Sequence, residues 1–157
     1  MEYLPHGGTH TWGQTTIGEF ISLMCGECLG SGCSREVFVF RLDPTKVIKV
    51  EMWAGMFHNV TEWHVWQEVK GTRWEKWFAP CWNISPCGTI LLQERTSPLQ
   101  SAPKRIPSFF TDVGSSNWGT LEGRPVCHDY GYNDLLTGGF RQGRMRPVSK
   151  DTFGLAA

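Results

Sequence analysis

A turn of small residues, Gly30-Ser31-Gly32, precedes the β-branched run Val47-Ile48-Lys49-Val50. Glycine has no Cβ, so the backbone N–H groups of such a turn can approach phosphate oxygens closely. An ammonium group on a following strand can then neutralise the same phosphates. This combination constrains the chain more than any other feature, because it predicts a strand, a phosphate-binding turn and a strand that carries Lys49.

The residues around Lys49 also predict an antiparallel hairpin. Residues 36–42 are β-branched and aromatic, Asp43-Pro44-Thr45 supplies a turn, and residues 46–51 pair back as the second strand. Residues 78–85 and 89–94 predict another hairpin. We therefore expect an α+β fold, with a twisted antiparallel sheet of about five strands and one packed helix.

That helix is predicted over residues 59–70, and its apolar stripe contains a glutamate. The stripe follows the i, i+3, i+4, i+7 spacing of one helix face and consists of Glu62, Val65, Trp66 and Val69. A carboxylate in an apolar stripe needs a cation as its partner, and Lys49 is the candidate. A shorter helix is expected over residues 17–24, where Thr15 or Thr16 provides the cap.

The composition indicates a globular protein without a strong electrostatic partner. The chain has 157 residues, of which 40% are hydrophobic and 19% charged, so it is long enough for one domain with a core. The 15 basic and 15 acidic residues cancel, which gives no indication of nucleic acid or a membrane surface as a partner. No secretory signal or membrane span is evident, so we expect a cytoplasmic protein with six reduced cysteines.

The remaining segments carry weaker signals. Residues 96–108 contain three prolines and predict a loop, whereas residues 117–128 predict a small hairpin turned by Gly119 to Gly123. Beyond Gly131 the chain is rich in Gly and Arg and predicts loop or tail. The expected organisation is an N-terminal arm with a short helix (1–24), a compact domain (25–131) and a C-terminal tail (132–157).

Two motifs follow in this last hairpin region. Asp112 and Asn117 have the spacing D-x-x-x-x-N, and Asp129-Tyr130-Gly131 comes shortly afterwards. Together with the glycine turn, Lys49 and Glu62, these motifs stand in the order of the protein-kinase signature set. Over residues 25–131 the chain thus resembles the protein-kinase-like superfamily, which includes protein kinases and aminoglycoside phosphotransferases.

The resemblance implies a role for each matched residue. Gly30, Ser31 and Gly32, with Val37 after them, would form the glycine-rich loop over the phosphates of ATP. Lys49 would hold the phosphates, Glu62 would hold Lys49, and the backbone around Glu94 would meet adenine. Asp112 would orient an attacking hydroxyl, while Asn117 and Asp129 would bind Mg²⁺. These roles imply a nucleotide-binding protein, and a transferase if a Ser, Thr or small-molecule hydroxyl accepts the phosphoryl group.

The chain also departs from the family pattern. Arg35 replaces the third glycine, and Phe110-Thr111 replaces the His-Arg or His-Gly that normally precedes the catalytic aspartate. The stretches after Thr96 and after Gly131 are too short for the helical lobe of an ordinary kinase. This reduced form resembles small kinase-like proteins of bacteriophages, which would place it in a host cytoplasm. It also favours an alternative function, a pseudokinase-like interaction protein that binds a partner such as a host protein or self-associates.

Each motif has an ordinary structural interpretation as well. The glycines would then form a plain hairpin turn, while Lys49 and Glu62 would lie on the solvated surface. Asp112, Asn117 and Asp129 would be turn residues, and His128 would bond locally. In that case the motifs are coincidental and the chain is a small structural protein.

Overall fold

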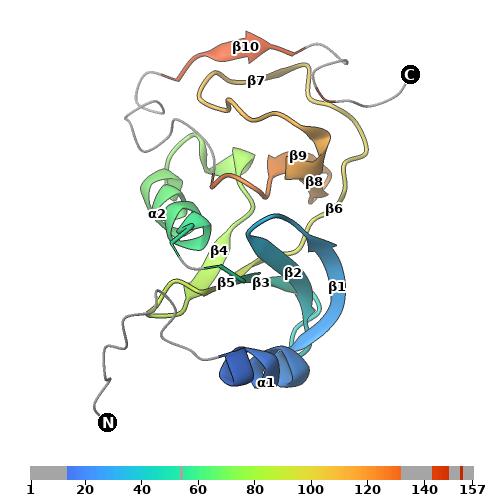
Figure 1. Cartoon of the computed structure of the whole chain (residues 1–157). Helices are drawn as coiled ribbons and strands as arrows, with labels where there is room; N and C mark the ends of the chain where they lie inside the picture. The colour runs from blue at the N-terminus through green and yellow to red at the C-terminus, as the bar shows by residue number, and fades with distance from the viewer. Residues whose placement is uncertain (1–13, 54, 132–142, 149–152, 154–157) are drawn as a thin grey trace. The chain divides into compact units, whose positions relative to one another are not determined.

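The computed structural model describes residues 14–53, 55–131, 143–148 and 153. The chain is α+β, as expected, and divides into two compact units (Figure 1). The first unit comprises residues 1–60 and 81–95, and the second comprises residues 61–80 and 96–157. The boundary falls inside a helix, between Val60 and Thr61.

The first unit contains a five-stranded antiparallel sheet of the expected size. Its strands lie in the order β1-β2-β3-β5-β4, so β3 is central. The strands are β1 (Cys25–Ser31), β2 (Arg35–Phe40), β3 (Lys46–Glu51), β4 (Cys81–Ile84) and β5 (Ile90–Glu94). The predicted strand over residues 46–51 is confirmed to the residue, because its alternating β-branched positions fit a central strand.

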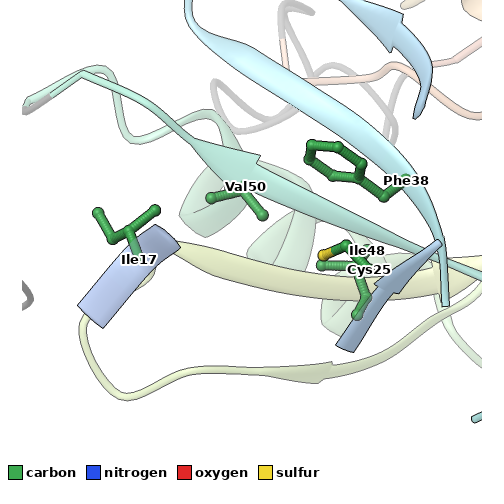
Figure 2. Close-up of a cluster of buried hydrophobic side chains, with 5 residues drawn as sticks. All are labelled: Ile17, Cys25, Phe38, Ile48 and Val50. Carbon is green, nitrogen blue, oxygen red and sulfur yellow. The ribbon is translucent and has the colours of Figure 1, made fainter. Parts of the chain in front are cut away.

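Helix α1 (Gln14–Met24) runs directly into β1 and packs on one face of this sheet. The core of that face is formed by buried side chains from the helix and the strands, shown in Figure 2: Ile17, Cys25, Phe38, Ile48 and Val50. The register explains the grouping, since Phe38, Ile48 and Leu92 lie opposite one another on β2, β3 and β5. Side chains at alternate positions must therefore point to the other face.

That other face carries Lys49. Val37, Lys49 and Leu91 lie opposite one another on the three central strands, and Gln93 follows Leu91 at the next inward position. Lys49, Leu91 and Gln93 are all buried. The ordinary alternative, in which Lys49 is a surface residue, is therefore wrong, because only 3% of Lys49 is exposed.

Helix α2 (His58–Val69) confirms the predicted helix over residues 59–70 to within one residue at each end. All four residues of the predicted stripe are buried: Glu62, Val65 and Val69 at 0% exposure and Trp66 at 4%. The interpretation of Glu62 as part of a solvated face is therefore wrong as well. The i, i+3, i+4, i+7 rule identified the buried face although one member is charged.

The second unit contains short β-structure around an aromatic cluster. Strands β8 (Trp118–Leu121) and β9 (Arg124–Cys127) form the predicted hairpin, turned at Glu122 and Gly123 with positive φ values of 50° and 75°. The 3-10 helix η2 (Ser115–Asn117) directly precedes β8, and the 3-10 helix η1 (Glu75–Trp77) lies earlier in the chain. The cluster consists of Trp74, Phe78, Phe109, Phe110, Trp118, Tyr130 and Phe153.

Residues 96–108 are more ordered than the predicted loop. They contain β6 (Ser97–Pro98), which pairs with β8, and β7 (Arg105–Pro107), which pairs with β10 (Met145–Pro147). Gly119 of β8 has no room for a Cβ, which would overlap Thr96 and lie 2.8 Å from the Ser97 carbonyl oxygen. The predicted arm over residues 1–13, and most of the tail beyond residue 131, lie outside the described residues.

Among the described residues, no helix is both long and apolar enough to cross a membrane. The six cysteines form no disulfide in the structure.

Candidate functional site

In the first unit, Lys49 lies on the central strand β3 beside Val37, a residue assigned above to the glycine-rich loop. Val37 is its cross-strand neighbour on β2, and Leu91 is its neighbour on β5. The structure therefore brings the Lys49 position next to the strand that leaves the glycine segment. A lysine with 3% exposure must have its charge compensated by an anionic group or hydrogen bonds.

The glycine segment itself is shifted from the predicted turn. Strand β1 continues to Ser31, and the Gly32 N–H donates to the Arg35 carbonyl at 2.8 Å, so Cys33 and Ser34 form the tip of the hairpin. The turn was expected at the glycines because of their freedom, yet neither has a positive φ. Gly30 has open space where a Cβ would stand, and the segment from Gly30 to Gly32 is exposed. Its backbone thus stays accessible to a ligand, while the N–H of Gly32 is already used within the hairpin.

Asn59, in the first turn of α2, is fully buried and joins several strands of the first unit. Its amide nitrogen donates to the Lys49 carbonyl at 3.2 Å and to the Thr89 carbonyl at 2.9 Å. Its amide oxygen accepts from Arg35 Nη1 at 3.3 Å, and its backbone N–H donates to a Glu51 carboxylate oxygen at 2.6 Å. These bonds fix the start of α2 directly against the backbone of the Lys49 strand.

Sequence reasoning missed Asn59 and Arg35 because a lone amide at a helix start and an arginine at a strand start are ordinary. The one signal in the sequence was Arg35 in the place of a glycine. A second bond beside them joins Ser34 Oγ and His58 Nδ1 at 2.9 Å. The hairpin tip and the helix start are thus held by a polar network instead of apolar packing.

Glu94 lies at the end of β5, opposite Lys46 of β3. Its carboxylate contacts Lys46 Nζ at 3.1 Å and accepts the indole N–H of Trp82 at 2.7 Å. By the strand alternation, the Glu94 side chain is on the α1 face of the sheet, away from Lys49. The side chain therefore does not reach the Lys49 face, and the resemblance assigned a role only to the Glu94 backbone.

In the second unit, Glu62 is connected to the predicted metal-binding triplet. A Glu62 carboxylate oxygen accepts the backbone N–H of Tyr130 at 3.2 Å, and both residues are fully buried. The Tyr130 hydroxyl donates to the Ala79 carbonyl at 2.9 Å. The middle residue of Asp129-Tyr130-Gly131 is therefore held at both ends, which a simple surface turn would not require.

Asp112, Asn117 and Asp129 are brought together by short backbone connections. The Asn117 carbonyl accepts the N–H groups of His128 at 2.8 Å and Asp129 at 3.2 Å. A Cβ placed on Gly114 would lie 3.8 Å from Asp112 Oδ1 and 3.9 Å from Asn117 Nδ2, so both side chains reach the same point. Four of the predicted site residues, Glu62 included, thus belong to one connected part of the second unit.

Some contacts also fit the ordinary interpretation of this segment. Asp112 Oδ1 accepts a long bond of 3.5 Å from the Gly114 N–H, which is the pattern of an Asx turn. His128 bonds to Thr96 Oγ1 at 2.8 Å and to the Ser116 carbonyl at 2.9 Å, partners that lie 32 and 12 residues away instead of next to it in the sequence. Since a carbonyl can only accept, His128 Nε2 carries the proton in that bond.

Within the described part of the chain, no three His, Cys, Asp or Glu side chains group closely enough to hold a metal ion by themselves. The pair Asn117 and Asp129 offers an amide and a carboxylate oxygen, the donors that Mg²⁺ prefers when waters or phosphates complete its shell. No protein-family model matches the chain, and no curated protein shows significant similarity to it.

The cysteines near the glycine segment should differ sharply in reactivity. Burial raises the pKa of the Cys25 thiol to about 11, against the opposing effect of Arg41, whereas Cys28 and Cys33 are exposed. At pH 8 only about one Cys25 in a thousand is then the reactive thiolate. We expect a disulfide reagent such as dithionitrobenzoate to modify Cys28 and Cys33 within minutes, and Cys25 only after unfolding. Mass mapping of the labelled native protein checks this, and early modification of Cys25 would contradict it.

Proposed function

We propose that the protein binds ATP together with Mg²⁺ as a reduced protein-kinase-like domain. The observation that carries this proposal is the burial of Lys49 on the central strand β3, beside the strand that leaves the glycine segment. In protein kinases the phosphate-binding lysine stands on the third strand, after a glycine-rich hairpin, and pairs with a helix glutamate. The order and placement of Gly30, Ser31, Gly32, Val37 and Lys49 follow that description.

Glu62 supplies the second argument. It is a fully buried carboxylate in an otherwise apolar helix stripe, and such a group needs a cation or hydrogen bonds to compensate its charge. We propose that Glu62 and Lys49 compensate each other's charge, since a buried lysine and a buried glutamate are each costly alone. The bond from the Tyr130 N–H would then connect this pair to the triplet that carries Asp129.

Asn117 and Asp129 are the proposed Mg²⁺ ligands. Their oxygen donors suit a hard cation, and the backbone bond from Asp129 to Asn117 keeps the two residues adjacent. When bound, Mg²⁺ neutralises the phosphate oxygens of ATP. Asp112, which reaches the same point as Asn117, is the residue proposed to orient a Ser, Thr or small-molecule hydroxyl for phosphoryl transfer.

Calorimetric titration tests the binding proposal directly. We expect ATP to bind at least tenfold more tightly with Mg²⁺ than with EDTA, because the cation offsets the repulsion between Asp129 and the phosphates. Asp129→Asn should remove most of this Mg²⁺ dependence. The matched control is Glu122→Gln, which neutralises an exposed carboxylate of the same unit that pairs only with Arg124. The absence of heat with ATP in both conditions would refute nucleotide binding.

A second function, that of a pseudokinase-like interaction protein, is favoured by a different observation. Five large apolar side chains of the first unit are more than half exposed: Leu23, Leu42, Trp53, Phe57 and Trp82. These side chains offer apolar contact area to a partner protein or a second copy. A light-scattering mass equal to one chain, with no co-purifying protein, would count against it.

A further inference from the structure

The two-stranded sheet of β7 and β10 concentrates positive charge. Residues 97–111 and 143–148 contain no aspartate or glutamate, yet they carry Lys104, Arg105, Arg144 and Arg146. The strands pair antiparallel over three residues each, and Figure 1 shows them side by side. A chain with no net charge thus has one short sheet on which all the charges are positive.

This sheet is fixed to the second unit by several contacts. The Ser108 N–H donates to the Arg144 carbonyl at 2.7 Å, and the Val148 N–H donates to the Lys104 carbonyl at 3.1 Å. Gly143 lies against the aromatic cluster, where a Cβ would stand 2.9 Å from Phe109 and 3.2 Å from Trp74. The backbone that carries the cations is therefore fixed in position.

Two of the guanidinium groups are oriented by backbone carbonyls. Arg105 Nη2 donates to the Met145 carbonyl at 2.6 Å, and Arg146 Nη2 donates to the Phe110 carbonyl at 2.8 Å. Each retains further N–H donors, since a guanidinium has five. In the part of the chain that the structure describes, none of the four cations forms an ion pair with a carboxylate.

We propose that the β7–β10 sheet is a docking surface for an acidic, extended segment of another protein. Guanidinium groups bind carboxylates in a two-pronged geometry, and four cations that lack a carboxylate partner among the described residues raise the local concentration of an anionic partner. The outer edge of β10 offers little for strand pairing, because Pro147 has no N–H and the Met145 carbonyl accepts from Arg105, so the charged side chains would provide the contacts. None of these four cations belongs to the proposed nucleotide site.

Nucleic acid is the other anionic partner, and the described residues favour it less. Single strands are bound by stacking their bases on exposed aromatic rings, but the large hydrophobic residues exposed in the structure all belong to the first unit. Duplex binding normally relies on a basic domain, whereas the whole chain is neutral. The charged surface is also only three residue pairs long, which suits a peptide.

Fluorescence anisotropy with a labelled ten-residue peptide of alternating Glu and Thr tests the docking surface. We expect saturable binding at low salt that weakens at least tenfold between 50 and 300 mM NaCl, because the contacts are exposed charges. Lys104→Gln with Arg144→Gln should weaken binding at least tenfold, and neither side chain makes a hydrogen bond in the described structure. The control is Lys70→Gln with Lys76→Gln, which removes the same charge from exposed positions of the same unit and should change the Kd less than twofold.

Three results would overturn this inference. The first is no peptide binding at low salt, and the second is equal weakening by the two double variants. The third is tighter binding of a labelled mixed-sequence oligonucleotide than of the acidic peptide. Circular dichroism verifies that both double variants fold. Arg105→Gln provides an additional test, at a residue whose guanidinium group donates to the Met145 carbonyl.

Discussion

Replacing Lys49 with methionine is expected to lower the free energy of unfolding by about 3 to 5 kcal/mol. Under the proposed pairing, the variant leaves the fully buried carboxylate of Glu62 without its cation. Glu62→Met should cost a similar amount, since it leaves the Lys49 ammonium uncompensated and removes the acceptor of the Tyr130 N–H. The measurement is urea unfolding followed by tryptophan fluorescence.

The double variant Lys49→Met with Glu62→Met separates pairing from mere burial. Two apolar side chains of similar size can replace a buried ion pair at little cost, so the double variant should be more stable than either single variant. As a control, the same double-mutant cycle is measured for Arg124 and Glu122, an exposed ion pair at 2.9 Å. The coupling free energy of this pair should stay below about 1 kcal/mol. If the effects of the two buried substitutions simply add, the side chains do not pair and the proposed function loses its main support.

The same variants distinguish nucleotide binding from stability. Lys49→Met should weaken ATP binding at least about 100-fold, which corresponds to about 2.7 kcal/mol, because the cation that would meet the phosphates is gone. The stabler double variant should be equally weak. Lys70→Met, which removes an exposed lysine, should bind ATP like the wild type. Restored ATP binding in the double variant would mean that Lys49 acts only through stability.

The parts of the fold that the sequence predicted are those with strong periodicity. Strand β3 was predicted to the residue because Val47, Ile48 and Val50 suit a central strand, and α2 was found through its stripe although Glu62 is charged. The burial of Glu62 was also expected, because the polar residue stood in an apolar pattern. That Lys49 compensates it, and that ATP and Mg²⁺ bind, remain predictions.

The parts that were not predicted depend on pairing between distant segments. Strand β7 pairs with β10 about forty positions later, and both strands contain proline and arginine, which have no strand signal. The hairpin tip was placed at the glycines, whereas Cys33 and Ser34 form it, because the register to β2 decides where a strand ends. The role of Asn59 could not be predicted from the sequence, because its hydrogen-bond partners come from three separate segments that meet only in the folded chain.

Asn59→Ala is expected to be the most damaging neutral substitution in the first unit, at about 3 to 5 kcal/mol of unfolding free energy. The variant removes two donors from the carbonyl oxygens of Lys49 and Thr89 and one acceptor from Arg35, all at a fully buried position. A buried hydrogen bond contributes about 1 to 1.5 kcal/mol, so the loss of three reaches this range although the Thr89 carbonyl still accepts the Glu51 N–H. The measurement is again urea unfolding.

Two further variants make the role of Asn59 specific. Asn83→Ala removes an exposed amide that bonds only to the next backbone N–H, so it should cost less than about 1 kcal/mol. Asn59→Asp preserves the shape but directs an oxygen toward two carbonyl oxygens, so it should destabilise about as much as alanine. A stable aspartate variant would show that volume at this position matters and that the donated bonds do not.

Because these bonds hold the start of α2 to the Lys49 carbonyl, Asn59→Ala should also weaken ATP binding more than it weakens adenosine binding. Equal weakening of both would limit Asn59 to a structural role.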